Sequence, residues 1–170
     1  MSQQVETGLV LASYHTFWLS ERIDDVPASG RRPSNGLVVP HMGAVEIWTG
    51  THTGNVPVTV ETRDDVPTTD DMSDWDDVVE VDVESVHGNL LVTSLFAHLP
   101  KELPNLAFHG AGLYRMRFYA RGRDSDPTYD TRAPDEHHRV ISWPVLSRTQ
   151  EAVLKRTDEY GTILRAQASH

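Results

Sequence analysis

The stretch that most restricts the fold is residues 113–123, which read Leu-Tyr-Arg-Met-Arg-Phe-Tyr-Ala-Arg-Gly-Arg. In a β-strand, successive side chains point to opposite faces of the sheet. One face would then hold Tyr114, Met116, Phe118 and Ala120. The other face would hold the guanidinium groups of Arg115, Arg117, Arg121 and Arg123. The pattern therefore predicts a half-buried strand whose outer face is a row of arginines.

Other short runs with alternating or apolar character indicate a chain made mainly of strands. They cover residues 8–20, 37–39, 44–49, 55–62, 78–86, 90–98 and 139–143, and glycine- or proline-bearing turns separate most of them. We expect 44–49 and 55–62 to form a hairpin, because the loop between them is short and contains glycine. The same argument predicts a hairpin of 78–86 and 90–98.

One helix is predicted, over about 148–160. The segment Ser147-Arg-Thr-Gln150 has the form of a capping box, and Gly161 is a plausible stop. Several short strands followed by a single late helix predict an all-β protein, an antiparallel β-sandwich that forms one domain over residues 1–170. A β-barrel is the alternative.

The net charge of −10 is concentrated in one part of the chain. Residues 61–84 contain eleven acids and one base, so this segment accounts for the whole imbalance. Such a field attracts basic proteins and repels nucleic acid. We therefore predict an acidic binding surface for a basic protein partner, with no direct contact to nucleic acid. Its predicted members are Asp70, Asp71, Asp74, Asp76, Asp77, Glu80, Asp82 and Glu84. The alternative is a solvated acidic loop.

The sequence contains no recognisable catalytic, cofactor or metal motif. It lacks the glycine-rich nucleotide signatures, a Gly-x-Ser-x-Gly elbow and His-Glu-x-x-His, and it has no cysteine. We therefore expect no cofactor and no metal site, and we regard an enzyme as less favoured than a binding protein. There is no apolar run long enough to cross a membrane and no signal-peptide pattern, so we expect a cytoplasmic protein without membrane contact.

The arginine row admits two interpretations. Guanidinium groups in a line can hold phosphates or carboxylates with paired hydrogen bonds, which would make Arg115, Arg117, Arg121 and Arg123 an anion-binding face. Alternatively, Arg115 and Arg117 pair across strands with Glu80, Asp82 and Glu84. The first interpretation predicts a small anionic ligand, and the second predicts a purely structural face.

Three patches resemble a known group of proteins. They are Ser13-Tyr-His-Thr-Phe-Trp18, Tyr114-Arg-Met-Arg-Phe-Tyr-Ala-Arg-Gly-Arg-Asp124 and His138-Arg-Val-Ile-Ser-Trp-Pro144. The pattern resembles small uncharacterised bacterial β-sandwich proteins that are similar to competence protein J, an inhibitor of a DNA-entry nuclease. The resemblance implies a protein that blocks a partner. It carries over no site residues, because the patches look like core and turn positions.

These observations together favour a non-catalytic binding protein, an inhibitor or immunity-type protein for a basic enzyme such as a nuclease, which acts through the acidic surface. One alternative is a protein or enzyme that binds a small anion on the strand face of Arg115, Arg117 and Arg121. Another is a structural or oligomerising domain without a site.

Overall fold

The computed structural model describes residues 3–22, 29–67, 72–94 and 103–169. Within these residues it contains ten strands, a short 3₁₀ helix and one α-helix. The elements are β1 (Gln4–Ser13), β2 (Thr16–Ser20), β3 (Val38–His41), β4 (Ala44–Trp48), β5 (Thr53–Thr62), β6 (Asp77–Ser85), β7 (Leu91–Thr93), β8 (Gly112–Arg121), η1 (Arg123–Ser125), β9 (His137–Pro144), β10 (Ala152–Arg156) and α1 (Glu159–Ala168).

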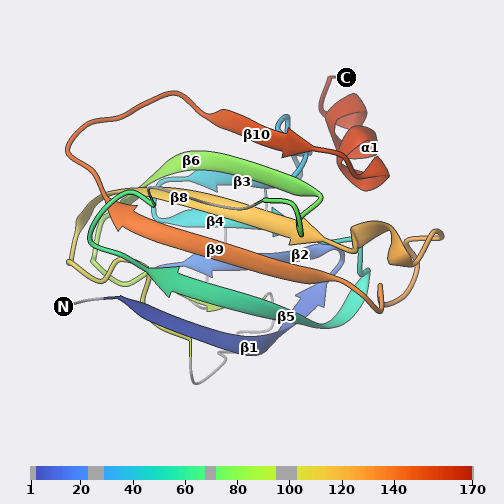
Figure 1. Ribbon diagram of the computed structural model, residues 1–170, viewed down its shortest axis with the longest axis horizontal. Coiled ribbons are helices and arrows are strands. Elements are labelled where there is room, and N and C mark those ends of the chain that lie inside the picture. The colour runs from blue at the N-terminus through green and yellow to red at the C-terminus, as the bar shows by residue number, and fades with distance from the viewer. Residues whose placement is uncertain (1–2, 23–28, 68–71, 95–102, 170) are drawn as a thin grey trace.

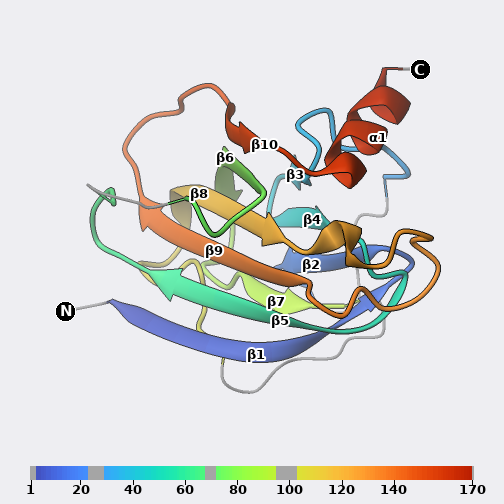
Figure 2. The same ribbon diagram turned by 45° about the vertical axis from the view of Figure 1, so that its right-hand side comes forward.

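All ten strands belong to one sheet, in the order β10-β6-β8-β9-β5-β1-β2-β4-β3, with β7 paired to β2 off this path. Neighbouring strands run antiparallel except β5 and β9, which are parallel. The sheet curls through 280° into an open half-barrel. Figures 1 and 2 show the curl, with β1 and β5 on the side opposite β10 and α1.

The predicted two-sheet sandwich is therefore wrong, although the prediction of a mostly β protein is confirmed. A sandwich buries its core between two separate sheets, whereas here the inner face of one sheet curls around a single core. Alternation along a strand reveals which side chains are buried. It does not reveal whether the opposing residues belong to a second sheet or to the far wall of the same one.

Both predicted hairpins are also wrong. β4 pairs with β2 and β3, whereas β5 pairs with β1 and β9. β6 pairs with β8 and β10, and β7 pairs with β2. Part of the predicted strand 90–98 lies outside the described residues. The short glycine loops thus connect strands that are not neighbours in the sheet. A short loop between two strands does not by itself require that the strands pair.

The predicted strand 8–20 is divided into β1 and β2 by a tight turn at Tyr14 and His15. Both residues have left-handed backbone conformations, with φ of 52° and 70°. Ser13 pairs with Thr16 across this turn. Left-handed conformations are uncommon outside glycine. Nothing in this aromatic-rich run marks the turn at Tyr14 and His15, so the sequence predicts one continuous strand.

The main core fills the inside of the curl. It contains residues from most strands and from the segment before β8, including Val10, Phe17, Leu19, Ile47, Val58, Val81, Leu90, Leu106, Met116 and Phe118. The predicted inward face of β8 is confirmed, because Tyr114, Met116, Phe118 and Ala120 are all buried. Half of the β8 alternation was therefore interpreted correctly from the sequence.

A second apolar cluster covers the outer face of β6, β8 and β9. It consists of Trp75, Val78, Tyr119, Ile141 and Trp143, with Met72 and Val145 packed against it. The outer face of the central strands is therefore not a simple solvated surface. Trp75 precedes β6 in the acidic segment and folds over Tyr119, with ring centroids 5.3 Å apart.

The helix prediction of 148–160 is wrong in position. Residues 152–156 form β10, which pairs with β6, and α1 begins only at Glu159. The helix is capped by Asp158, whose carboxylate accepts a hydrogen bond from the Gly161 amide at 2.7 Å. Asp158 is a standard N-cap, but the Ser147 capping-box pattern drew the prediction upstream. Among the described residues, none of the helical segments is long and apolar enough to cross a membrane.

The two ends of the sheet, β3 and β10, leave an open seam that the segment before β3 bridges. Asn35 donates its side-chain amide to Glu151, just before β10, at 2.9 Å, and its carbonyl oxygen accepts from the Val38 amide. Pro40, within β3, has no N–H to offer at this edge. The seam is thus closed by side chains and by α1, and not by a strand ladder.

The inward face of β8 makes a direct prediction. Phe118→Ala should lower the free energy of unfolding by about 3–5 kcal/mol, because Phe118 is buried in the core. Leu9→Ala is the matched control: Leu9 is 63% exposed on β1 and should change stability by less than about 0.5 kcal/mol. Urea unfolding measures both. Equal losses for the two variants would contradict the assigned register.

Candidate functional site

The arginine face of β8 is engaged by carboxylates of β6. The Arg115 guanidinium donates to Glu80 and to Asp82, each at 2.9 Å, and Arg117 donates to Glu80 at 2.7 Å. Arg115 also donates to the Gln150 carbonyl, which covers it from the segment before β10. The predicted cross-strand pairing is confirmed for Glu80 and Asp82. An anion from solution would have to displace both carboxylates to reach Arg115.

Three arginines of β8 and β9 lie against aromatic rings. The Arg117 guanidinium carbon is 5.6 Å from the Trp143 ring centroid, and that of Arg121 is 4.8 Å from Trp75. Arg139 of β9 lies 5.1 Å from Tyr119 and donates to Glu61 at 2.6 Å. These contacts place the cations over the outer apolar cluster, where they shield it from water.

Arg123 does not belong to this face, so the prediction that it lies on the outer face of the strand is wrong. It has no exposed surface. The strand alternation ends at Gly122, whose φ of 71° turns the chain, and an added Cβ there would lie 2.1 Å from the Asp135 carbonyl oxygen. Alternation extended through this glycine predicts an outward-facing Arg123. The left-handed residue instead sends Arg123 inward.

The buried Arg123 guanidinium joins four parts of the chain. It donates to both carboxylate oxygens of Asp158 at 2.6 and 2.9 Å, and to Asp77 at 3.1 Å. It also donates to the carbonyls of Gly36 and Trp48 at 3.0 and 3.2 Å. One side chain thereby connects β6, the N-terminus of α1, the end of β4 and the loop before β3.

The acidic segment is distributed over very different environments. Asp70 and Asp71 lie outside the described residues. Asp74 is exposed, and Asp76 accepts a hydrogen bond from the Gly122 amide at 2.9 Å. Asp77 is completely buried beside Arg123, so its predicted place on an exposed surface is wrong.

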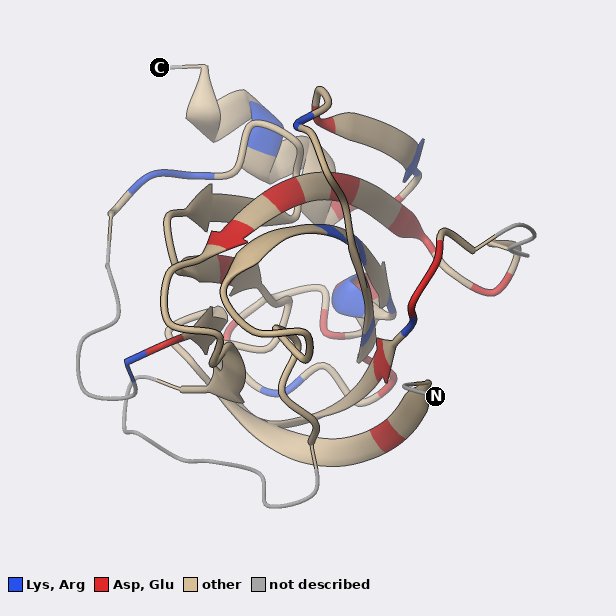
Figure 3. Cartoon of the chain, turned by 90° about the vertical axis from the view of Figure 1, so that its left-hand side faces the viewer, with Lys and Arg blue, Asp and Glu red and all other residues tan. Residues whose placement is uncertain are grey.

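The strand acids of this segment are paired. In addition to the pairs of Glu80 and Asp82, Glu84 accepts from Arg148 at 2.7 Å. Figure 3 shows the acidic positions of β6 following one another along its length. Their charges are largely compensated by arginines of β8 and of the segment before β10. The charge run in the sequence thus forms, in large part, an internal ion-pair network.

Acids that the sequence interpretation did not select gather in the loop between β8 and β9. Residues 122–136 contain five acids and two arginines, one of which is the buried Arg123. Asp130 and Asp135 are exposed. Asp126 accepts hydrogen bonds from the hydroxyls of Thr128 and Thr131, and these bonds hold the pKa of Asp126 well below its usual range.

This loop is fastened to its neighbours by a buried carboxylate. Glu136 accepts from the Thr51 amide at 2.8 Å and from its hydroxyl at 2.7 Å, and it lies 2.6 Å from Nε2 of His138. Burial alone would raise the pKa of Glu136, but the hydrogen bonds and the charge of His138 lower it. Asp124 accepts from the Tyr129 hydroxyl and from the amides that begin α1. We call residues 122–136 the acidic loop.

An aromatic cleft of about 300 Å³ opens between the acidic loop and α1. His15, Trp48, Tyr129 and Tyr160 supply its rings. The His15 and Tyr160 rings are 5.7 Å apart and nearly parallel, and the Tyr129 and Tyr160 rings are 5.0 Å apart. His15 and Tyr129, with φ of 70° and 56°, are two of the three non-glycine left-handed positions of the described chain, and both line this cleft. Such conformations are often found at ligand sites.

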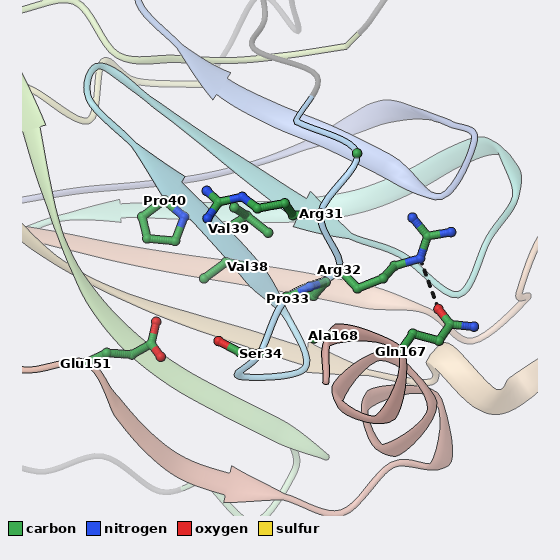
Figure 4. Close-up of a pocket in the computed structure, with 11 residues that line it drawn as sticks. Arg31, Arg32, Pro33, Ser34, Val38, Val39, Pro40, Glu151, Gln167 and Ala168 are labelled. Atoms are coloured by element: carbon green, nitrogen blue, oxygen red, sulfur yellow. Dashed lines mark hydrogen bonds between the residues drawn. The ribbon is translucent and has the colours of Figure 1, made fainter. Parts of the chain in front are cut away.

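A larger groove of about 760 Å³ lies along the seam. Figure 4 shows its wall of Val38, Val39 and Pro40, with Arg31 and Arg32 leaving the preceding loop in different directions. Arg32 donates to Gln167 of α1 at 2.9 Å, and its guanidinium carbon lies 4.7 Å from the Trp48 ring centroid. Arg32 and Gln167 line both this groove and the aromatic cleft.

The sequence interpretation missed the cleft and the groove. Their residues come from segments far apart in the chain, and no local motif links them. The adjacent Arg31 and Arg32 beside Pro33, in a loop rather than a strand, were the one visible signal. In the described residues, no group of three or more acids and histidines is arranged to hold a metal ion.

The Arg123 network makes a stability prediction. Arg123→Ala should lower the free energy of unfolding by about 3–5 kcal/mol, because Asp77 and Asp158 would remain buried without their cation. The matched control is Arg148→Ala, which breaks a largely exposed pair with Glu84 and should cost less than about 1 kcal/mol. Chemical denaturation measures both, and a loss below that of Arg148→Ala would refute the role assigned to Arg123.

We expect the protonation of His137 to cause part of the pH dependence of stability. Burial, together with the nearby Arg121 and His138 charges, lowers the pKa of His137 to about 4. The unfolded chain, with a histidine pKa near 6.5, then binds more protons than the folded one between these values. Stability should therefore fall as pH drops from 6.5 to 5, and His137→Gln should reduce this fall. Thermal midpoints across this range test it, with the exposed His87→Gln as control; identical profiles for both variants would contradict the assignment.

No family model matches the sequence, and no curated protein matches it. Among solved structures it is similar to ComJ of Bacillus subtilis, described as an inhibitor of the DNA-degrading activity of NucA, with a TM-score of 0.54 and 13% identity over 85% of this chain and 96% of ComJ. It is also similar to a protein described as crocagin biosynthetic gene J, with a TM-score of 0.50 and 16% identity over 86% of this chain and 100% of the other. The resemblance to competence protein J inferred from the sequence is therefore confirmed at the level of the fold.

Proposed function

We propose that this protein binds and blocks a basic enzyme, with nucleases as the first class to test, and does not catalyse a reaction itself. The observation that carries the proposal is the fold shared with ComJ, which extends over 96% of that nuclease inhibitor. The net charge of −10 supports it, because an acidic protein attracts a basic partner over long range.

The acidic loop is the surface best suited to this contact. Its exposed acids, Asp130 and Asp135, have no cation within salt-bridge distance among the described residues. Glu80, Asp82 and Glu84, by contrast, already bind arginines of their own chain. Only carboxylates that are not compensated internally retain their full attraction for a partner. We therefore place the contact at the acidic loop in preference to the segment 64–84.

The construction of the loop supports the same assignment. Asp126 and Glu136 fix its backbone through hydrogen bonds to Thr128, Thr131 and Thr51. The His52 amide donates to the Thr131 carbonyl, which ties the loop to the turn between β4 and β5. A loop that is held in place before binding loses little conformational entropy in a complex, which favours affinity.

Aromatic residues border the acidic loop at the same end of the sheet. Tyr14, in the turn between β1 and β2, is 65% exposed and packs edge-on against His52, with ring centroids 5.4 Å apart. Tyrosine is enriched among the residues that dominate binding energy at protein interfaces. An exposed tyrosine beside exposed acids is therefore a suitable anchor for a basic partner.

The test begins with capture of the partner from the native host, followed by assays with both purified proteins. The DNA-degrading activity of the captured enzyme should fall as this protein is titrated, with an end point at a fixed stoichiometry. Asp130→Asn combined with Asp135→Asn should slow association by about tenfold or more at low salt and leave the thermal midpoint nearly unchanged. Wild-type association should slow steeply as salt rises.

The matched control neutralises two exposed acids of the other segment, Asp65→Asn with Asp74→Asn, which removes the same charge. We expect a small effect from this variant. A large effect here, with none from the loop variant, would transfer the contact to the segment 64–84. A captured enzyme that keeps its full activity in a saturated complex would refute inhibition altogether.

A further inference from the structure

The aromatic cleft and the seam groove are adjacent, and Arg32 and Gln167 form the boundary between them. Of the two exposed acids assigned to the partner contact above, only Asp130 also lines the cleft. The hydrogen bond from Arg32 to Gln167 is exposed, so this boundary consists of two flexible side chains at the surface. A ligand that is too long for the aromatic cleft alone can therefore extend past Arg32 into the groove.

The cleft contains ring faces together with a polar atom that lacks a partner in the described chain. Trp48 is only 7% exposed, and its indole N–H is buried without a hydrogen-bond acceptor among the described residues. Burial keeps a buried N–H or O–H from water, so an unpaired one is costly unless a ligand supplies its partner.

His15 adds an acceptor to the cleft. Its Nδ1 lies 2.9 Å from the Thr49 carbonyl oxygen, which can only accept, so Nδ1 carries the proton and Nε2 has a free lone pair. Burial lowers the pKa of His15, which keeps the ring neutral near pH 7. The cleft therefore offers stacking surfaces with both donors and acceptors, which is the chemistry that a planar heteroaromatic ring requires.

The groove supplies positive charge. Arg31 and Arg32 line it, and neither has a carboxylate within salt-bridge distance in the described structure. Seven other arginines do have one within 4.0 Å: Arg63, Arg115, Arg117, Arg123, Arg139, Arg148 and Arg165. Glu151, which accepts from Asn35, also lines the groove and brings one negative charge against the two guanidiniums. Two guanidiniums against one carboxylate, beside a cavity in an otherwise acidic chain, indicate an anion site.

We propose that the joined cavities bind a small planar anion, with an aromatic ring stacked in the cleft and an attached phosphate or carboxylate held by Arg32 at the entrance to the groove. The rings of His15, Trp48, Tyr129 and Tyr160 line the ring site, and Asp130 at its edge accepts a ring N–H. Arg31 contacts a longer anionic group, because its side chain extends further along β3 (Figure 4). A nucleoside monophosphate and an aromatic amino acid with a free carboxylate share this chemistry.

The test follows the four tryptophan indole N–H signals of ¹⁵N-labelled protein, with the Trp48 signal assigned from Trp48→Phe. The probes are adenosine 5′-monophosphate, adenosine, N-acetyltryptophan and inorganic phosphate. We expect a saturable shift of the Trp48 signal with at least one of the two ring-bearing anions. If the ligand is a nucleotide, adenosine and inorganic phosphate should each bind about tenfold more weakly than adenosine 5′-monophosphate. Adenosine lacks the phosphate that Arg32 holds, and inorganic phosphate lacks the ring that stacks in the cleft.

Variants separate this site from nonspecific binding. Arg32→Gln should lower the affinity for the anion about tenfold, because it removes the guanidinium. Arg156→Gln is the matched control: Arg156 is exposed on β10, away from both cavities, and its loss should leave affinity unchanged. Preference for N-acetyltryptophan over the nucleotide would assign a carboxylate ligand. No saturable shift up to about 10 mM of either anion, or equal effects of the two variants, would overturn the proposal.

Discussion

The structure depends on the buried charge of Arg123. A guanidinium without any exposure is tolerated only where carboxylates and carbonyls satisfy it, and Asp77, Asp158, Gly36 and Trp48 together do so. Because these partners come from β6, α1, β4 and the loop before β3, their positions are mutually determined. The curl of the sheet, the attachment of α1 and the floor of the aromatic cleft are thereby coupled to one side chain.

Sequence reasoning recovered what local periodicity encodes and failed where the answer is non-local. The inward face of β8 and its ion pairs with Glu80 and Asp82 follow from a period of two and from charge complementarity. The parallel pairing of β5 with β9, and the curl of one sheet instead of a sandwich, depend on contacts between distant segments. The helix was misplaced because the capping pattern at Ser147 and the true cap at Asp158 look equally good locally.

The candidate sites were harder to foresee, for an electrostatic reason. Charge counted along the chain does not distinguish acids that face solvent from acids that face arginines. The strand acids of the densest acidic run bind arginines of their own chain, whereas the sparser acidic loop exposes Asp130 and Asp135. The same reasoning applies to cations: among the described residues, Arg115 and Arg117 of the conspicuous row on β8 bind carboxylates, and the inconspicuous Arg31 and Arg32 do not.

The edge of β3 has a consequence for behaviour in concentrated solution. An open half-barrel leaves a strand edge on which a second copy could add its own strand, the usual route to domain swapping and fibre growth. The two residues of β3 that face away from β4 present no free N–H, because Asn35 accepts that of Val38 and Pro40 has none. The β3 edge therefore stays uncovered along the groove and still denies a neighbouring chain the N–H donors that strand addition at this edge requires.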